Sequence, residues 1–240
     1  MRQSEGAEVK KIVDALRSLG DPVHAEQAQR FFKTGKGEYA EGDVFLGIRV
    51  PVLRKQLKAH RLLPLESVCQ LLLSRYHEVR LFALLLMVEA FKRGNQQERK
   101  NIYQAYLQHS ASINNWDLVD SSAHHIVGAY LTDRDKRILH QLAQSPVLWE
   151  RRIAMIACFH DIKRGEFTEA LRIAGRLLGD EHDLMHKAVG WMLREIGKRD
   201  MAVERAFLDQ HYSRMPRTML RYAIEHFPES LRQRYLQGKV

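Results

Sequence analysis

The sequence has few of the residues that disulfide-linked or turn-rich proteins need. Its 240 residues include 2 cysteines, 6 prolines and 14 glycines. Two distant cysteines, Cys69 and Cys158, cannot build a disulfide framework, so we expect a reducing cytoplasm. The low proline and glycine content argues against a β-sandwich or a propeller. The N-terminus lacks the apolar core of an export signal, and the longest apolar run, Leu81 to Val88, is too short to span a bilayer. We therefore expect a soluble protein of the cytoplasm.

Negative charge is scarce relative to positive charge. The chain has 29 Asp and Glu residues against 38 Lys and Arg residues, a formal net charge of +9 at pH 7. This excess favours a polyanionic partner. The sequence has no P-loop, no Rossmann glycine pattern, no Gly-x-Ser-x-Gly and no Cys-x-x-Cys. Nucleotide hydrolysis, hydride transfer and serine-hydrolase chemistry are therefore unsupported, and we predict no cofactor.

Apolar residues recur at spacings of three and four along nearly the whole chain, which predicts an all-α protein. Clear helical segments begin near Glu66, Val79, Arg152 and Met185, and Gly94, Gly165 and Gly197 follow the last three of them as expected helix ends. There is no convincing stretch with the period of two that a strand requires.

The predicted helices repeat. Ala154, Ala188 and Ala223 occupy equivalent places at intervals of 34 and 35 residues, and Ala83 lies 71 residues before Ala154, with a copy at 115–123 between them. Such a period predicts stacked helix pairs of the HEAT or tetratricopeptide type, which form a curved solenoid with a basic concave surface. The alternative is an irregular bundle in which the alanines allow close packing. The spacing over five copies favours the array.

The first 44 residues differ from the rest. They predict capping helices over about 7–19 and 22–32, followed by a glycine-rich polar loop at 35–42. Pro51 then suits the first turn of a helix that carries the basic residues Arg54, Lys55 and Lys58. We read this segment as a cap on the array and predict one domain over residues 1–240.

Trp116 and Asp120 are the most interesting pair for chemistry. They are four residues apart and share one face of a helix, although aspartate is a poor helix former and costly to bury alone. The alternative is structural: Asn115 or Asp117 caps the helix, Trp116 lies in the core and Asp120 is solvated.

Arg151 and Arg152 stand at the head of the next repeat, where positive charge opposes the helix dipole. A carboxylate from Glu150 or Asp120, or a phosphate, would compensate them; a surface salt bridge is the alternative. Gly190 lies in mid-helix beside Trp191, where glycine costs about 1 kcal/mol relative to alanine. Either a ligand or a tightly packed helix must therefore approach the backbone. Whether these groups converge depends on the exact repeat length, which the sequence leaves open.

Other candidates are weaker. His182 and His186 have the i, i+4 spacing of a zinc helix but lack a third ligand, so we predict no metal site. His124 and His125 are adjacent, face two directions on a helix and do not chelate. Basic residues gather late in the chain and suit phosphate contacts or a solvated face: Arg214, Arg217, Arg221, Arg232 and Arg234.

Four motifs together resemble the AlkD-type DNA alkylation repair proteins. They are Phe45-Leu-Gly-Ile with Pro51 and Arg54, Trp116-Asp-Leu-Val-Asp120, Trp149-Glu-Arg-Arg152 and Lys187-Ala-Val-Gly-Trp191-Met-Leu-Arg-Glu195, and their order and spacing match over nearly the whole chain. The resemblance implies a monomeric HEAT-like DNA glycosylase that removes N3- and N7-alkylated purines from duplex DNA without flipping the base into a pocket.

The same resemblance assigns roles to particular residues. It implies that Trp116, Asp120 and Trp191 form the active site and that Arg152 contacts the DNA backbone. We expect Arg151, Lys187, Arg217 and Arg221 to bind DNA as well. Two residues depart from the family pattern: Asn115 replaces a frequent tryptophan, and Phe31 stands where tyrosine is frequent and receives no role.

Two other classes remain open. A non-catalytic protein that binds DNA structures would share the basic array but would not need Asp120. A protein-interaction scaffold would share the repeats but would need neither the tryptophans nor the positive charge.

Overall fold

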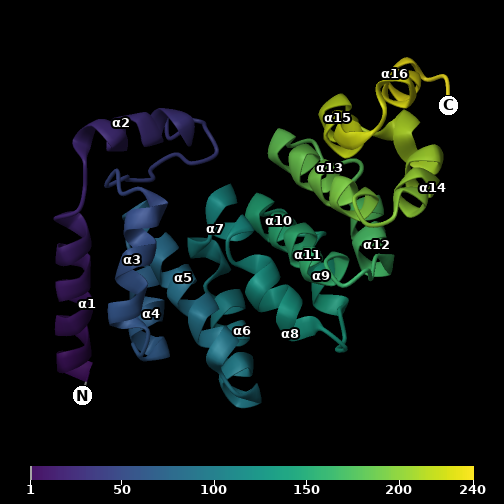
Figure 1. Cartoon of the computed structure of the whole chain (residues 1–240). Coiled ribbons are helices and arrows are strands. Elements are labelled where there is room, and N and C mark those ends of the chain that lie inside the picture. The colour runs from purple at the N-terminus through teal and green to yellow at the C-terminus, as the bar shows by residue number, and fades with distance from the viewer. Residues whose placement is uncertain (1) are drawn as a thin grey trace. The chain divides into compact units, whose positions relative to one another are not determined.

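The computed structural model describes residues 2–240, with side chains from Gly6 onward, and almost all of its regular structure is helical (Figure 1). The extended pairing among these residues is one isolated parallel bridge between Val44 and Tyr76. The predicted all-α class is therefore confirmed. In the described part of the chain, no helix combines the length and the apolar character needed to cross a membrane.

The chain divides into two compact units, the first ending at Ser122 and the second beginning at Ala123. The single domain predicted over 1–240 stays a prediction. The first unit contains α1 (Arg2–Arg17), α2 (Pro22–Phe31), α3 (Val50–His60), α4 (Leu65–Leu72), α5 (His77–Arg93), α6 (Gln96–Gln108), η1 (Ser110–Ser112) and α7 (Trp116–Asp120).

The second unit is built around its longest helix, α13. Its elements are the π-helix η2 (His124–Gly128), α8 (Ala129–Leu131), α9 (Arg137–Leu142), α10 (Leu148–Ala157), α11 (Phe159–Ile162), α12 (Thr168–Arg176), α13 (Asp183–Gly197), α14 (Met201–His211), η3 (Tyr212–Arg214), α15 (Arg217–Ala223), η4 (Ile224–His226) and α16 (Glu229–Gln237).

The predicted helical repeat is confirmed in the order of the helices in the second unit. In the second unit α9 precedes α10, α12 precedes α13 and α14 precedes α15, and the second helices begin at Leu148, Asp183 and Arg217, which are 35 and 34 residues apart. In the first unit α4 precedes and packs on α5. The second helix of each pair carries the alanine from which the period was read. The curvature and the basic concave surface remain predictions.

One expected copy is irregular. The copy predicted over 115–123 consists of the short helix α7 alone, and the chain then continues as the π-helix His124–Gly128. Expected helix ends also differ in detail. Gly94 does end α5, although with extended rather than left-handed backbone. The helix through Arg152 ends earlier, at Ala157, and Gly197 is the last residue inside α13.

Helix α5 is the centre of the first unit. Its 17 residues are buried on nearly all sides, and α3, α4 and α6 pack against it. Pro51 lies in the first turn of α3, as predicted. The N-terminal turn of α5 is polar. Its Glu78 side chain accepts hydrogen bonds from the backbone N–H groups of Leu46, Gly47 and Ile48 at 2.8, 2.7 and 3.2 Å.

Gly47 explains why the Phe45-Leu-Gly-Ile segment needs glycine. Its φ is +80°, and a Cβ there would lie 2.1 Å from the carbonyl oxygen of Asp21, the N-cap of α2. The absent side chain therefore allows α2 to begin against this segment. The capping helices of residues 1–44 are present, with bounds Arg2–Arg17 and Pro22–Phe31.

Gly190 also allows a close approach between two segments, in this case inside the second unit. A Cβ on it would lie 2.4 Å from the carbonyl oxygen of Met219 and 2.5 Å from Cβ of Tyr222, both on α15. The structure therefore favours the packing explanation of this glycine: α13 and α15 approach each other closely, and α13 also packs on α10, α12 and α14.

Replacing Gly190 by alanine should destabilise the protein by about 1–3 kcal/mol, because the overpacking of α15 outweighs the gain of about 1 kcal/mol in helix propensity. Gly175 in α12 is the matched control, since a Cβ added there would meet no other atom within 4 Å. Gly175→Ala should leave stability unchanged or raise it. Urea unfolding of both variants measures the difference, and equal shifts would contradict the packing role.

Candidate active site

Helix α7 carries two of the predicted catalytic residues, and Asn115 is its N-cap. The Asn115 side chain is fully buried, and its Oδ1 accepts a hydrogen bond from the N–H of Trp116 at 2.8 Å. Its amide nitrogen donates to Asp43 at 3.4 Å. Asp117 Oδ1 accepts from the N–H of Leu118 at 2.9 Å. The capping expected from the sequence is therefore present, and Asn115 performs it from a buried position.

Trp116 is half-buried at the end of an aromatic layer and is not a core residue. Its ring stacks on Phe32 with centroids 5.1 Å apart and planes at 19°. Phe32 in turn stacks on Phe45 at 4.9 Å. Phe31 meets the Trp116 ring edge-on at 5.9 Å and is 66% exposed. Trp116 is therefore held by other rings while an exposed aromatic residue lies beside it.

The aromatic neighbours of Trp116 were not predicted. Phe31 and Phe32 are about 85 positions before Trp116 in the sequence, and no spacing pattern links them. The only available signal was the family resemblance, which marked the position of Phe31 without giving it a role.

Asp120 is the last residue of α7 and is half-buried. Its carboxylate lies near Tyr106, whose hydroxyl is 2.9 Å from that of Ser122. Burial raises the pKa of Tyr106 far above its ordinary value, and the negative charge of Asp120 adds to the shift. Since Asp120 lies one turn after Trp116, a carboxylate and an indole occupy the same short helix, as the sequence predicted.

Beneath α7 lies a buried ionic cluster that the sequence analysis missed. His77 contacts Asp43 through Nδ1 at 3.1 Å and Asp117 through Nε2 at 2.8 Å. Arg80 donates to the other oxygen of Asp43 at 2.6 Å and to Asn114 at 3.1 Å. The cluster joins the segment before α3, the first turn of α5 and the first turn of α7.

The remaining predicted residues belong to the second unit. Trp191 lies on α13, half-buried, with its ring 5.6 Å from that of Phe159. Lys163 Nζ lies 4.1 Å above the Phe159 ring. Burial and the nearby Arg199 lower the pKa of Lys163. Trp191 thus stands next to an aromatic ring that already carries a cation on its face.

The two arginines at the head of α10 have protein partners. Arg151 binds Asp180 through Nε at 2.6 Å and Nη2 at 3.3 Å, and it also donates to the carbonyls of Ser145 and Pro146. Asp180 is therefore a compensating carboxylate for Arg151, and the sequence did not point to it. Arg152 is 5% exposed and donates to the carbonyl of Leu184 at 2.5 Å.

The other residues expected to bind DNA are more accessible. Lys187 forms an ion pair with Asp183 at 2.7 Å on α13. Arg217 is exposed and donates to the carbonyl of Leu236 at 2.7 Å. Arg221 is exposed on α15. Of the five predicted DNA-binding residues, Arg221 is the one most readily available to a phosphate.

The histidine pairs have structural explanations. His182 caps α13 by accepting the N–H of Leu184 at 3.1 Å, and His186 Nε2 lies 2.5 Å from the carbonyl oxygen of Asp180. Within the described residues, no three His, Cys, Asp or Glu side chains group as metal ligands would. The rings of His124 and His125 lie 3.8 Å apart. The two rings therefore pack against each other, whereas we expected them to face two directions.

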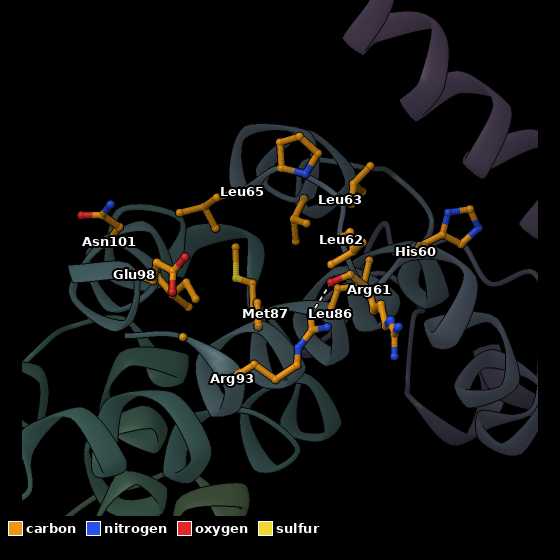
Figure 2. A pocket seen from close by; sticks show the side chains of 15 residues that line it. His60, Arg61, Leu62, Leu63, Leu65, Leu86, Met87, Arg93, Glu98 and Asn101 are labelled. Carbon is orange, nitrogen blue, oxygen red and sulfur yellow. Dashed lines mark hydrogen bonds between the residues drawn. The ribbon is translucent and has the colours of Figure 1, made fainter. Parts of the chain in front are cut away.

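Two cavities of the first unit lie at opposite ends of α5. One, of about 310 Å³, is lined by Phe31, Phe32, Phe45, His77 and Asp117 among others and is adjacent to the aromatic layer. The other, of about 510 Å³, lies near the C-terminal end of α5 and is lined by Leu62, Leu65 and Met87 among others (Figure 2). Arg93 donates a hydrogen bond to the carbonyl oxygen of Arg61 at this cavity. It contains none of the predicted site residues.

The predicted active-site residues are divided between the units. Trp116 and Asp120 belong to the first, and Trp191 with Arg152 to the second. Each group has the local setting described above. The convergence of the two groups stays a prediction.

Comparison with known proteins gives a consistent result. The structure is similar to a protein of Enterococcus faecalis described as a predicted DNA alkylation repair enzyme, with a TM-score of 0.67, 18% identity, and coverage of 88% of this chain and 97% of that one. It is also similar to the crystal structure of smu.31 from Streptococcus mutans UA159, with a TM-score of 0.51, 17% identity, and coverage of 93% and 96%. These likenesses show a shared helical fold. Among curated proteins none matches the chain.

The family match is more specific than the structural likeness. A sequence model described as DNA alkylation repair enzyme matches residues 12–227, a range that includes all four motifs and every predicted site residue. The resemblance expected from the sequence is therefore confirmed: this chain belongs to the family of DNA alkylation repair enzymes.

Proposed function

We propose that the protein is a DNA glycosylase that excises cationic N3- and N7-alkylated purines, such as 3-methyladenine and 7-methylguanine, from duplex DNA. Membership of the DNA alkylation repair family supports the general role. The observation that carries the specific proposal is the short helix α7, which presents a half-buried carboxylate, Asp120, one turn from a tryptophan fixed by stacked rings.

The chemistry suits such a simple site. Alkylation at N3 or N7 makes the purine cationic, so the base leaves with the electron pair of the C1′–N bond and needs no protonation. Positive charge then develops at C1′ and O4′ of the sugar. A water molecule adds to C1′ and releases its proton, and the sugar keeps a hydroxyl group. The protein therefore needs mainly to stabilise the oxocarbenium character of the transition state.

Asp120 is the proposed source of that stabilisation. At about 4 Å and an effective dielectric near 20, a carboxylate attracts a unit positive charge by about 4 kcal/mol, which corresponds to roughly a thousandfold in rate. In this proposal Asp120 also orients the attacking water. A carboxylate with this role needs access to the sugar, and half-burial on a short helix is compatible with that need.

Trp116 and Trp191 are the proposed holders of the sugar and the cationic base. Ring-face contacts with a cation contribute about 0.5–2 kcal/mol each. Trp116 is already ordered by Phe32, so little side-chain entropy remains to be lost when it binds DNA. In this proposal the lesion stays in the duplex and the protein holds the backbone around it.

We propose phosphate contacts for the accessible basic side chains. Arg221 is the strongest candidate, and Arg217 and Lys187 are further candidates. Arg151 and Arg152 bind protein acceptors, so contact with phosphate would require them to share or exchange these bonds. We therefore propose that both arginines support DNA binding chiefly in an indirect way, because they hold α10 against its neighbours within the second unit.

Asp120→Asn should abolish most release of 7-methylguanine and leave DNA affinity within about threefold, because the amide removes the charge but keeps the shape. Release from a methylated duplex under single-turnover conditions measures the rate, and fluorescence anisotropy on undamaged duplex measures affinity. Asp14→Asn on α1, an exposed carboxylate, is the control and should leave both unchanged. Unchanged release by Asp120→Asn would remove Asp120 from the mechanism. DNA binding without any release by the wild type would favour the non-catalytic binder.

Arg221→Ala and Arg151→Ala should separate DNA binding from stability. Losing one phosphate contact should reduce the slope of log affinity against log salt by about 0.9 for Arg221→Ala, with little change in unfolding. Arg151→Ala should instead lower the free energy of unfolding by about 2 kcal/mol, because Asp180 keeps a buried charge without its partner. Salt titrations of DNA binding and urea unfolding provide the two measurements. Equal slopes for Arg221→Ala and the wild type would contradict the phosphate contact.

A further inference from the structure

The contacts of His77 determine the charge that its imidazole must carry. Both ring nitrogens lie within hydrogen-bond distance of a carboxylate oxygen. The Nδ1 atom of His77 faces Asp43, and its Nε2 atom faces Asp117. A neutral imidazole has one N–H and can donate to only one of them. Both contacts are hydrogen bonds only when His77 is an imidazolium. The side chain is 2% exposed, against 5% for Asp43 and 18% for Asp117.

The surroundings favour that charged form. Burial alone would lower the pKa of His77, but the hydrogen bonds to Asp117 and Asp43 outweigh it and raise the pKa to about 9. The charge of Arg80 opposes the shift. The adjacent Glu78 is engaged by the backbone of residues 46–48. His24 and Arg49 are the other charged or titratable groups that line the cavity beside His77.

His77 also contacts the aromatic layer that holds Trp116. Its ring stacks on Phe45 with centroids 4.4 Å apart and lies 5.1 Å from that of Phe32. Phe32 is the ring on which Trp116 stacks. His77 therefore reaches α7 by two routes: through Asp117 to the first turn of the helix, and through Phe32 to the indole at its start.

We propose that His77 is a positioning residue of the candidate active site, an imidazolium clamped between Asp43 and Asp117 that fixes α7 and with it Trp116 and Asp120. The link to activity rests on the proposed glycosylase function, whereas the clamp itself does not. A neutral imidazole cannot replace it, because the two carboxylates would then share a single N–H donor.

The clamp should weaken at alkaline pH. A group whose pKa is raised on folding stabilises the native state fully below its unfolded pKa, near 6.5, and this stabilisation is lost as pH rises toward its folded pKa, about 9. Above that pH the neutral ring can keep only one of its two carboxylate contacts. The position of Trp116 should then change.

His77→Gln tests the clamp directly, because glutamine can donate a hydrogen bond but cannot become a cation. In a Trp149→Phe, Trp191→Phe background Trp116 is the only tryptophan, so its fluorescence reports its own surroundings. We expect an emission change centred near pH 9 that is absent when His77→Gln is added. In the wild type, nitrogen NMR of the histidine rings should show both His77 nitrogens protonated at pH 7.5. A neutral His77 at that pH would overturn the proposal.

The catalytic readout needs a control for stability. His77→Gln should reduce the single-turnover release of 7-methylguanine by about tenfold at pH 7.5, with DNA affinity changed by less than threefold. Ile102→Ala removes a buried side chain of α6, outside the cluster, and should destabilise the same unit without changing the rate at temperatures well below unfolding. An equal rate loss in both variants would make His77 merely structural.

A double-mutant cycle gives a third measurement. Asp117→Asn should slow release in the wild type but add less than twofold to His77→Gln, because the link between the two residues is already broken. Independent, multiplicative effects would contradict the clamp. If the wild type releases no base at all, the glycosylase proposal fails, while the NMR and fluorescence measurements still decide the role of His77.

Discussion

The structure of the first unit depends on how α5 buries charge. Nearly the whole helix lies in an apolar interior, yet its first turn contains His77, Glu78 and Arg80. Charges in such a place are costly unless each meets an opposite charge or a hydrogen-bond donor. Glu78 meets three backbone N–H groups, Arg80 meets Asp43, and His77 meets two carboxylates. These requirements bring the segment before α3 and the start of α7 to one end of α5, and the candidate site is built on that end.

Much of the fold was predictable because it follows from periodicity. The alanine interval of 34–35 residues located the second helices of the pairs, and α10, α13 and α15 begin at that interval. Gly190 was predicted to allow a close approach, and the neighbour proved to be α15. The irregular copy around α7 was not predictable in this way, because a period gives the place of a helix but not its length. The ring contact between His124 and His125, with centroids 3.8 Å apart, was not predictable from helical spacing either.

The candidate site was predictable only in part, since its parts differ in how they are encoded. Trp116 and Asp120 share a helix, so their spacing of four predicted a common face. The contacts that hold them involve Phe32, Asp43 and His77, which are 39 or more positions away from α7 and form no sequence pattern with it. Such contacts arise from tertiary packing. Arg151 is a second example of the same limit. Its motif was recognised in the sequence, but its partner Asp180, which lies 29 residues away, was not identified.

The use of arginine in the described structure limits what net charge can say about DNA binding. Several arginines donate to backbone carbonyl oxygens at helix ends, where a cation also suits the helix dipole. Arg99 donates to the carbonyl of Phe91, Arg134 to that of Tyr130 and Arg199 to that of Glu195. Each adds to the formal charge of +9, yet its hydrogen-bonding capacity is partly used within the fold. The excess of positive charge is therefore only permissive for a polyanionic partner. The sharper indication comes from α7, where Asp120 lies one turn from an indole held by aromatic rings, a combination that phosphate binding alone does not require.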